Sequence, residues 1–176
     1  MKFAIAGAGY IAAIHARAIK NCGGQLHAVV DAYPEKAQAF ARQFEIEHQY
    51  ATVRDLLQHG GSDALVIGTP NYLHAPQALT ALEAGIPVLV EKPMAMNAGE
   101  AEQMLAASQR SGVPLMIAHC WRFDQDVLWL KEQLDCIGRV VRTKSYGVHA
   151  NWGPSGWFTQ KEFAGGGALA DMGIHA

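Results

Sequence analysis

The sequence predicts an α/β fold built on a doubly wound parallel sheet. Short, continuously apolar runs alternate with amphipathic helical patterns through the first half of the chain. Continuous rather than alternating apolar runs are typical of strands buried on both faces, as in parallel sheets covered by helices. This alternation stops near His119, so we expect a first domain over residues 1–119 and the start of another over 120–176.

Each element of the first domain has its own pattern. Helix ends carry the expected punctuation, with Gly85 and Gly112 directly after two helices and Pro87 and Pro114 just beyond. The predicted strands are Lys2–Gly7, Gln25–Asp31, Asp63–Gly68, Ile86–Val90 and Leu115–His119. The predicted helices between them are Tyr10–Asn21, Pro34–Phe44, Leu73–Ala84 and Ala98–Ser111.

Beyond His119 the pattern predicts a helix over Asp124–Asp135, a long strand over Arg139–Ala150 and a last helix from Gly166. These elements hold too few residues for a sheet with its own core, and the chain stops inside a helix. We therefore expect an incomplete second domain. The preferred explanation is a fragment, and the alternative is that another chain supplies the remainder.

Composition excludes several classes of protein. The 176 residues are 50% hydrophobic and 17% charged, with a net charge of -2 and no block of Lys or Arg, which argues against nucleic acid or an anionic membrane as partner. Three widely spaced cysteines favour a reducing cytoplasm over a disulfide framework. The apolar stretch after Lys2 imitates a short signal peptide, but Gly7 and Gly9 suit a strand-turn-helix better. The histidines show no metal-ligand spacing, so no metal is expected.

A glycine-rich turn joins the first predicted strand to the first helix. It reads Gly7-Ala8-Gly9-Tyr10-Ile11-Ala12, the G-x-G-x-x-A pattern of Rossmann-type dinucleotide sites. Gly7 suits a tight turn, Gly9 lets a pyrophosphate approach the backbone, and Ala12 keeps the helix close to the sheet. Asp31, at the end of the next strand, can accept hydrogen bonds from ribose hydroxyls and favours NAD over NADP. A flavin or a methyl donor stays possible on this motif alone.

Two further motifs carry a resemblance to a known family. The first runs from Gly68-Thr69-Pro70-Asn71-Tyr72-Leu73-His74 to Glu91-Lys92-Pro93, and the second is Gly165-Gly166-Gly167-Ala168-Leu169-Ala170-Asp171-Met172-Gly173-Ile174-His175. In this order, behind the glycine turn, they resemble the Gfo/Idh/MocA oxidoreductases over essentially the whole chain. The resemblance implies a Rossmann domain followed by an α+β domain with a large open sheet, which often serves in oligomerisation. It also implies a longer chain and, for the full-length form, a homo-oligomer.

Lys92, Asp171 and His175 are the candidate catalytic residues. Lys92 follows a strand's carboxyl end, where an ammonium can steady charge on a reacting oxygen. Asp171 and His175 are four apart, so on one helix the carboxylate can orient the imidazole, which acts as general base. A surface lysine, a capping Asp and an exposed His are the plain alternatives. Whether Lys92 or His175 moves the proton is left open.

The resemblance also implies supporting residues. The expected cofactor contacts outside the glycine turn are Asp31, Thr69, Pro70, Asn71, His74, Glu91 and Lys92, although His74 is equally well explained as a structural residue. By the same resemblance Arg122 is an expected substrate contact. Asn151, Trp152 and Trp157 are expected substrate contacts for a different reason, because aromatic faces and amides suit sugar C–H and O–H groups, although a packed aromatic loop explains these three equally well.

The sequence thus predicts an NAD-dependent dehydrogenase acting on a hydroxyl of a sugar, polyol or cyclitol. One alternative is a glycosidase of the NAD-dependent kind, which oxidises its substrate transiently. Another is a non-catalytic nucleotide sensor, which needs only the nucleotide pocket. Substrate identity is not readable from these residues.

Overall fold

The computed structural model describes residues 1–144, 146 and 155–175. Six parallel strands form one sheet in the order β3-β2-β1-β4-β5-β6. This confirms the predicted doubly wound fold. The strands are β1 (Lys2–Ala6), β2 (Gln25–Val30), β3 (His48–Tyr50), β4 (Ala64–Ile67), β5 (Val88–Val90) and β6 (Leu115–Ile117).

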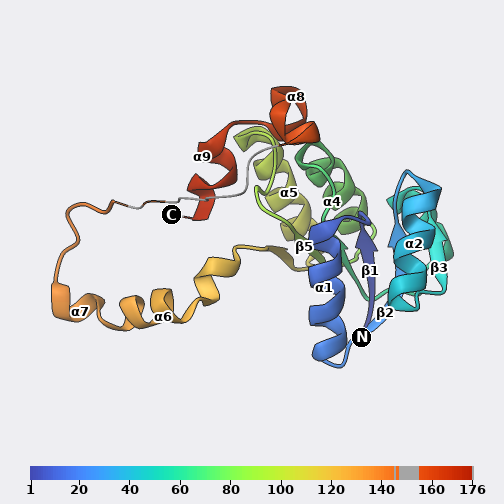
Figure 1. Ribbon diagram of the computed structural model, residues 1–176, viewed down its shortest axis with the longest axis horizontal. Helices are drawn as coiled ribbons and strands as arrows, with labels where there is room; N and C mark the ends of the chain where they lie inside the picture. Colours follow the sequence, from blue (N-terminus) through green and yellow to red (C-terminus); the bar gives the residue numbers. More distant parts are fainter. Residues whose placement is uncertain (145, 147–154, 176) are drawn as a thin grey trace.

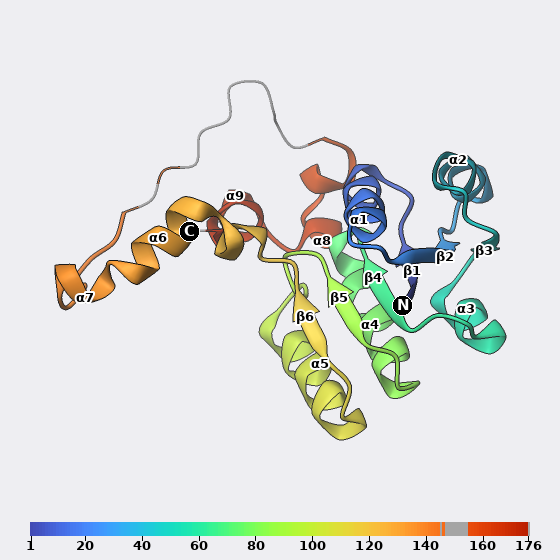
Figure 2. The same ribbon diagram turned by 90° about the horizontal axis from the view of Figure 1, so that it is seen from below.

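Helices cover both faces of the sheet, as Figure 2 shows. α1 (Tyr10–Asn21) and α2 (Pro34–Phe44) pack on one face. α3 (Val53–His59), α4 (His74–Glu83) and α5 (Ala98–Ser111) pack on the other. Each face has its own apolar cluster, so the strands contribute buried side chains in both directions. This two-sided burial explains why the strands appear in the sequence as unbroken apolar runs.

The strand order reverses at β1, which pairs with β2 on one side and β4 on the other. In doubly wound sheets such a reversal leaves a crevice at the carboxyl ends of the strands, where ligands bind. The glycine turn follows β1, and the Gly68–His74 motif follows β4 through a 3-10 turn at Asn71–Leu73. The sequence motifs therefore meet at this edge.

The prediction missed two elements, β3 and α3. β3 is a three-residue edge strand of His, Gln and Tyr, with no apolar run to reveal it. α3 is short but starts with a capping box, in which Thr52 accepts the N–H of Asp55 and the Asp55 carboxylate accepts the N–H of Thr52. That Thr-x-x-Asp signature was visible in the sequence.

The segment after β6 differs from its prediction. The helix expected over Asp124–Asp135 is two helices, α6 (Gln125–Glu132) and α7 (Leu134–Ile137), which extend away from the sheet (Figure 1). No strand forms over residues 139–144 and 146, although one was predicted over Arg139–Ala150. A strand needs a neighbour to accept its backbone hydrogen bonds, and the described residues provide none there.

The last described segment returns to the carboxyl edge of the sheet. It contains a 3-10 turn at Gly156–Thr159, α8 (Lys161–Ala164), α9 (Ala168–Asp171) and a 3-10 turn at Gly173–His175. The expected single helix from Gly166 is thus replaced by α9 and a separate turn. Within the part of the chain that the structure describes, no helix is long and apolar enough to cross a membrane.

Candidate dinucleotide and substrate site

A cavity of about 1330 Å³ opens at the carboxyl ends of the strands. This is larger than the roughly 300–1,000 Å³ of ordinary small-molecule pockets, and it suits an extended ligand. Its walls come from the glycine turn, the ends of β2 and β5, the loop after β4 and the segment from Ser155. Of the residues predicted to bind the cofactor, those that line it are Gly7, Gly9, Tyr10, Ile11, Asp31, Thr69, Pro70, Asn71, His74, Glu91 and Lys92.

The glycine turn leaves room for a ligand at one position and not at another. Gly7 has φ +94°, and a Cβ there would lie 2.7 Å from the carbonyl oxygen of Gly68. A side chain at this position would therefore push β1 and β4 apart. At Gly9 a Cβ would meet no atom within 4 Å, so that backbone faces open space in the cavity. Ala12 is fully buried and does not line the cavity, because it packs α1 onto the sheet.

The first turn of α1 fits an anion. Gly9 is its N-cap, no side chain caps the helix, and no acidic residue lies in its first turn. The first backbone N–H groups of a helix have no partner within it and carry a partial positive charge. Open space at Gly9 and uncapped N–H groups at the start of α1 therefore fit the pyrophosphate of a dinucleotide.

Asp31 braces the turn from the end of β2. One carboxylate oxygen accepts the backbone N–H of Ala8 at 2.9 Å, and the other accepts that of Tyr33 at 2.9 Å. A carboxylate has about four lone-pair positions, so acceptor capacity remains on the side that lines the cavity. Asp31 thus combines a structural role with an acceptor site for ribose hydroxyls.

His74 is 1% exposed and lies at the start of α4. Its Nδ1 is 2.8 Å from the carbonyl oxygen of Pro93 and its Nε2 is 2.9 Å from that of Thr69. Burial lowers the pKa of His74, outweighing these carbonyls and the charge of Glu91. A neutral ring donates to only one of the carbonyls. The ring ties the loop after β4 to the one after β5, which matches the structural alternative.

Glu91 follows β5 and uses both carboxylate oxygens locally. Oε1 lies 2.7 Å from Nε2 of His15 on α1, and Oε2 accepts the backbone N–H of Lys92 at 3.1 Å. The prediction assigned His15 no role, because its spacing matched no metal motif. The sequence did offer one signal of a buried contact for His15. This residue lies one turn beyond Ala12, on the face of α1 that meets the sheet.

Lys92 pairs with Asp171, which lies at the end of α9. The Lys92 Nζ donates to the Asp171 carboxylate at 2.6 Å and to the Asp171 backbone oxygen at 3.1 Å. Their side chains are 19% and 17% exposed, so the pair is largely shielded from water. An ammonium with two donors engaged keeps one N–H for a further acceptor, and both residues line the cavity.

His175 is not held by Asp171 as expected. α9 ends at Asp171, so the two residues do not share a helical face, and the carboxylate is directed to Lys92. Nδ1 of His175 is buried without a hydrogen-bond partner, and the ring stacks on Trp121 with centroids 5.4 Å apart. Burial and the charge of Lys92 lower the pKa of His175, while Asp171 opposes them. The ring is therefore neutral near pH 7.

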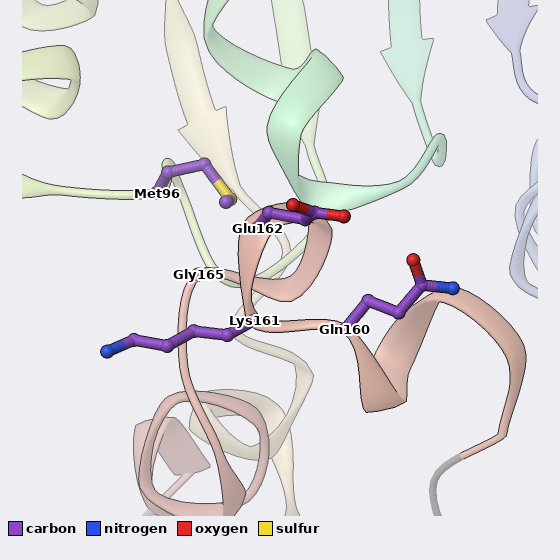
Figure 3. A pocket seen from close by; sticks show the side chains of 5 residues that line it. All are labelled: Met96, Gln160, Lys161, Glu162 and Gly165. Atoms are coloured by element: carbon purple, nitrogen blue, oxygen red, sulfur yellow. The ribbon is translucent and has the colours of Figure 1, made fainter.

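The last segment docks through glycine and aromatic contacts. A Cβ on Gly165, where φ is +77°, would lie 2.9 Å from Sδ of Met96, and the ring of Phe163 lies 5.1 Å from that of Tyr72. Figure 3 shows Met96 beside Gly165, with the side chains of Gln160 and Lys161 extending to opposite sides. The open hollow at this junction is separate from the large cavity. The close approach of this backbone to Met96 explains why residue 165 is a glycine.

Of the four predicted substrate contacts, one lines the cavity, one does not, and two lie outside the described residues. Trp157 lines the cavity and stacks on Phe158. Arg122 lies in the exposed 3-10 turn Cys120–Phe123 and does not line the cavity. Asn151 and Trp152 lie outside the described residues. Over residues 1–144, 146 and 155–175, no group of three or more His, Cys, Asp or Glu could hold a metal ion.

Lys36 and Arg54 also line the cavity and were not predicted, and Nζ of Lys36 lies 4.4 Å from the centroid of the Tyr33 ring. Both are exposed cations on the first turns of α2 and α3. β3 lies between the two helices in the chain, and both pack against it from opposite faces of the sheet. Because β3 and α3 were missed in the sequence, Arg54 had no predicted place at the site, whereas Lys36 lies in a predicted helix and was overlooked.

Comparison with known families matches residues 1–119 to the Gfo/Idh/MocA group, described as "Oxidoreductase family, NAD-binding Rossmann fold". The chain belongs to this oxidoreductase family. The match covers the glycine turn, Asp31 and the Glu91-Lys92-Pro93 motif, which confirms the resemblance seen in the sequence.

Individual relatives agree with the family. A putative UDP-kanosamine synthase oxidoreductase subunit from Amycolatopsis mediterranei is 38% identical, covering 84% of this chain and 41% of the relative. D-glucoside 3-dehydrogenase from Escherichia coli is 33% identical, covering 99% and 51%. The crystal structure of GenD2 from gentamicin A biosynthesis in complex with NAD matches with a TM-score of 0.86 at 28% identity, covering 100% and 51%. The chain thus spans about half the length of these proteins.

Proposed function

We propose that this chain forms the cofactor domain and part of the substrate site of an NAD-dependent dehydrogenase that acts on a hydroxyl of a sugar, polyol or cyclitol. The observation that carries this proposal is the Lys92–Asp171 pair, which lies in the wall of the same cavity as the glycine turn. A nucleotide sensor needs the glycine turn, but it has no use for a shielded ion pair in the wall of the same cavity.

The cofactor half of the proposal rests on the turn and on Asp31. The N–H groups at the start of α1 would hold the pyrophosphate, and the Asp31 carboxylate would accept the adenosine ribose hydroxyls. A 2′-phosphate would meet the negative charge of Asp31 at close range, so NAD is preferred to NADP. The nearby Lys36 and Arg54 are exposed to solvent, which screens their offsetting charge.

A bound NAD would supply the acceptor for the hydride that leaves the substrate carbon. The proton of the substrate hydroxyl must leave at the same time, and His175 is the better acceptor for it. Its lowered pKa keeps the ring neutral near pH 7, whereas an ammonium paired with a carboxylate has no lone pair. The remaining N–H of Lys92 would donate to the reacting oxygen and stabilise the charge that develops there.

Asp171 has a different role from the one predicted. By accepting two hydrogen bonds from Lys92, it fixes the direction of the remaining donor. Its charge also opposes the lowering of the His175 pKa. In the proposed arrangement Asp171 positions Lys92, and His175 would be the base because both charges act on its ring, although His175 itself does not line the cavity.

Calorimetric titration with NAD and NADP, followed by absorbance of reduced nicotinamide with a panel of sugars and cyclitols, tests the proposal. We expect saturable binding with a preference for NAD, and turnover with at least one cyclic polyol. Binding of neither nucleotide would contradict the cofactor assignment. Release of a glycosidic leaving group without net reduction of NAD would instead identify a glycosidase.

A further inference from the structure

His15 forms a shielded hydrogen bond that the proposed mechanism does not use. Its Nε2 lies 2.7 Å from Oε1 of Glu91, and the two side chains are only 16% and 12% exposed. The bond joins α1, whose first turn faces the cavity, to the residue directly after β5. A carboxylate so shielded from water is destabilised if it loses a partner.

Glu91 transmits this contact to the substrate end of the site. Its second oxygen accepts the backbone N–H of Lys92 at 3.1 Å, while its own N–H donates to the Ile67 carbonyl at 2.9 Å. Both its backbone and its side chain are therefore fixed. Glu91 therefore holds the backbone of Lys92, and Asp171 holds its side chain.

We propose that His15 is a positioning residue for the nicotinamide half of the dinucleotide, acting through Glu91. This inference rests on the proposed function. The imidazole fixes one carboxylate oxygen, and the backbone of Lys92 fixes the other. Glu91 lines the cavity. The lone pairs that remain on its carboxylate then form a preorganised acceptor for a ribose hydroxyl.

A purely structural pair would predict a different result. If the bond only held α1 against β5, its loss would shift the first turn of α1 and weaken contacts with every part of the dinucleotide. If His15 positions Glu91, its loss weakens only the half of the ligand that reaches the end of β5. ADP and NAD separate these cases, because ADP lacks the nicotinamide riboside.

The experiment measures ADP and NAD affinities by calorimetry for the wild-type chain and for His15→Ala, His15→Asn and His15→Gln. The asparagine side chain is too short to reach Glu91, whereas the glutamine amide can donate to it. His59→Ala, on the exposed side of α3 away from the cavity, is the matched control.

We expect His15→Ala and His15→Asn to bind NAD about tenfold more weakly, in line with the loss of one hydrogen bond to a charged group. ADP affinity should change less than about twofold, His15→Gln should recover most of the NAD affinity, and His59→Ala should match the wild type. Equal loss of ADP and NAD affinity, or unchanged NAD affinity, would overturn the inference. A wild-type chain that binds neither ligand would instead refute the proposed function, and the inference with it.

Discussion

The parallel sheet and the segment that follows residue 119 differ in where their apolar side chains lie. In the sheet, strands and helices bury apolar clusters on both faces. In α6, by contrast, Val127, Leu128, Trp129 and Leu130 are between 41% and 62% exposed. The difference teaches that the sheet supplies the stability, while the later segment adds chemistry to the site through a few specific contacts at its end.

The largest expected effect is on the free energy of unfolding, and a pair of matched leucines tests it. Leu82 on α4 is fully buried in the core, and Leu130 on α6 is 50% exposed. Leu82→Ala should lower the free energy of unfolding by about 2–5 kcal/mol, because it removes buried contacts and leaves a cavity. Leu130→Ala should change it by less than about 0.5 kcal/mol. Urea denaturation followed by circular dichroism measures both, and similar losses would show that α6 is part of the folded core.

The next effect separates binding from chemistry at the Lys92–Asp171 pair. Lys92→Met should reduce turnover by about 10²–10³-fold, the usual cost of removing a preorganised donor. NAD affinity should change little, because the pyrophosphate and adenosine contacts lie elsewhere in the cavity. Lys161→Met, on the exposed start of α8, is the control and should leave both unchanged. A large fall in NAD affinity in Lys92→Met would reassign this lysine to the cofactor.

A smaller effect concerns the attachment of the last segment. The buried Asn71 side chain donates to the Ala164 carbonyl at 2.8 Å. Asn71→Ala leaves that carbonyl without its partner, at a cost of about 1–3 kcal/mol. We expect faster hydrogen exchange in residues 161–171, with the exchange of β1 and β4 unchanged. Asn21→Ala, at the exposed end of α1, should alter neither, and uniform acceleration across the sheet would contradict a local role for Asn71.

The same contrast explains how far the sequence could predict the fold. Strands buried on both faces and helices bounded by glycine have local patterns, so β1, β2, β4, β5 and β6 were predicted within a few residues. β3 has no such pattern, because an edge strand of three residues is defined by its pairing with β2. The predicted strand over Arg139–Ala150 failed in its described part for the opposite reason. Its pattern was present, but a pairing partner was not.

The site was predictable where a motif fixes backbone geometry. Gly7, Gly9 and Asp31 act through the turn and the end of a strand, and the structure brings them into one cavity. Partner choice was not predictable. The spacing of Asp171 and His175 favoured a pair, yet α9 ends between them and the carboxylate bonds Lys92 instead. The contact between His15 and Glu91 joins residues far apart in the sequence, so only the three-dimensional structure reveals it.

The smallest expected effect is a pH dependence of stability that arises in the sheet domain. Burial lowers the pKa of His74 below its ordinary value of 6.5, so the folded chain binds fewer protons than the unfolded chain as the pH falls through 6.5. The free energy of unfolding should therefore decrease on acidification from pH 7.5 to 5.5. His175, whose pKa is also lowered, contributes with the same sign. Urea denaturation at a series of pH values should give a shallower dependence for His74→Gln, which cannot titrate, and an unchanged one for the exposed control His59→Gln. An equally steep dependence in His74→Gln would mean that folding does not lower the pKa of His74, and a steeper one would mean that its two carbonyl contacts hold the folded ring protonated.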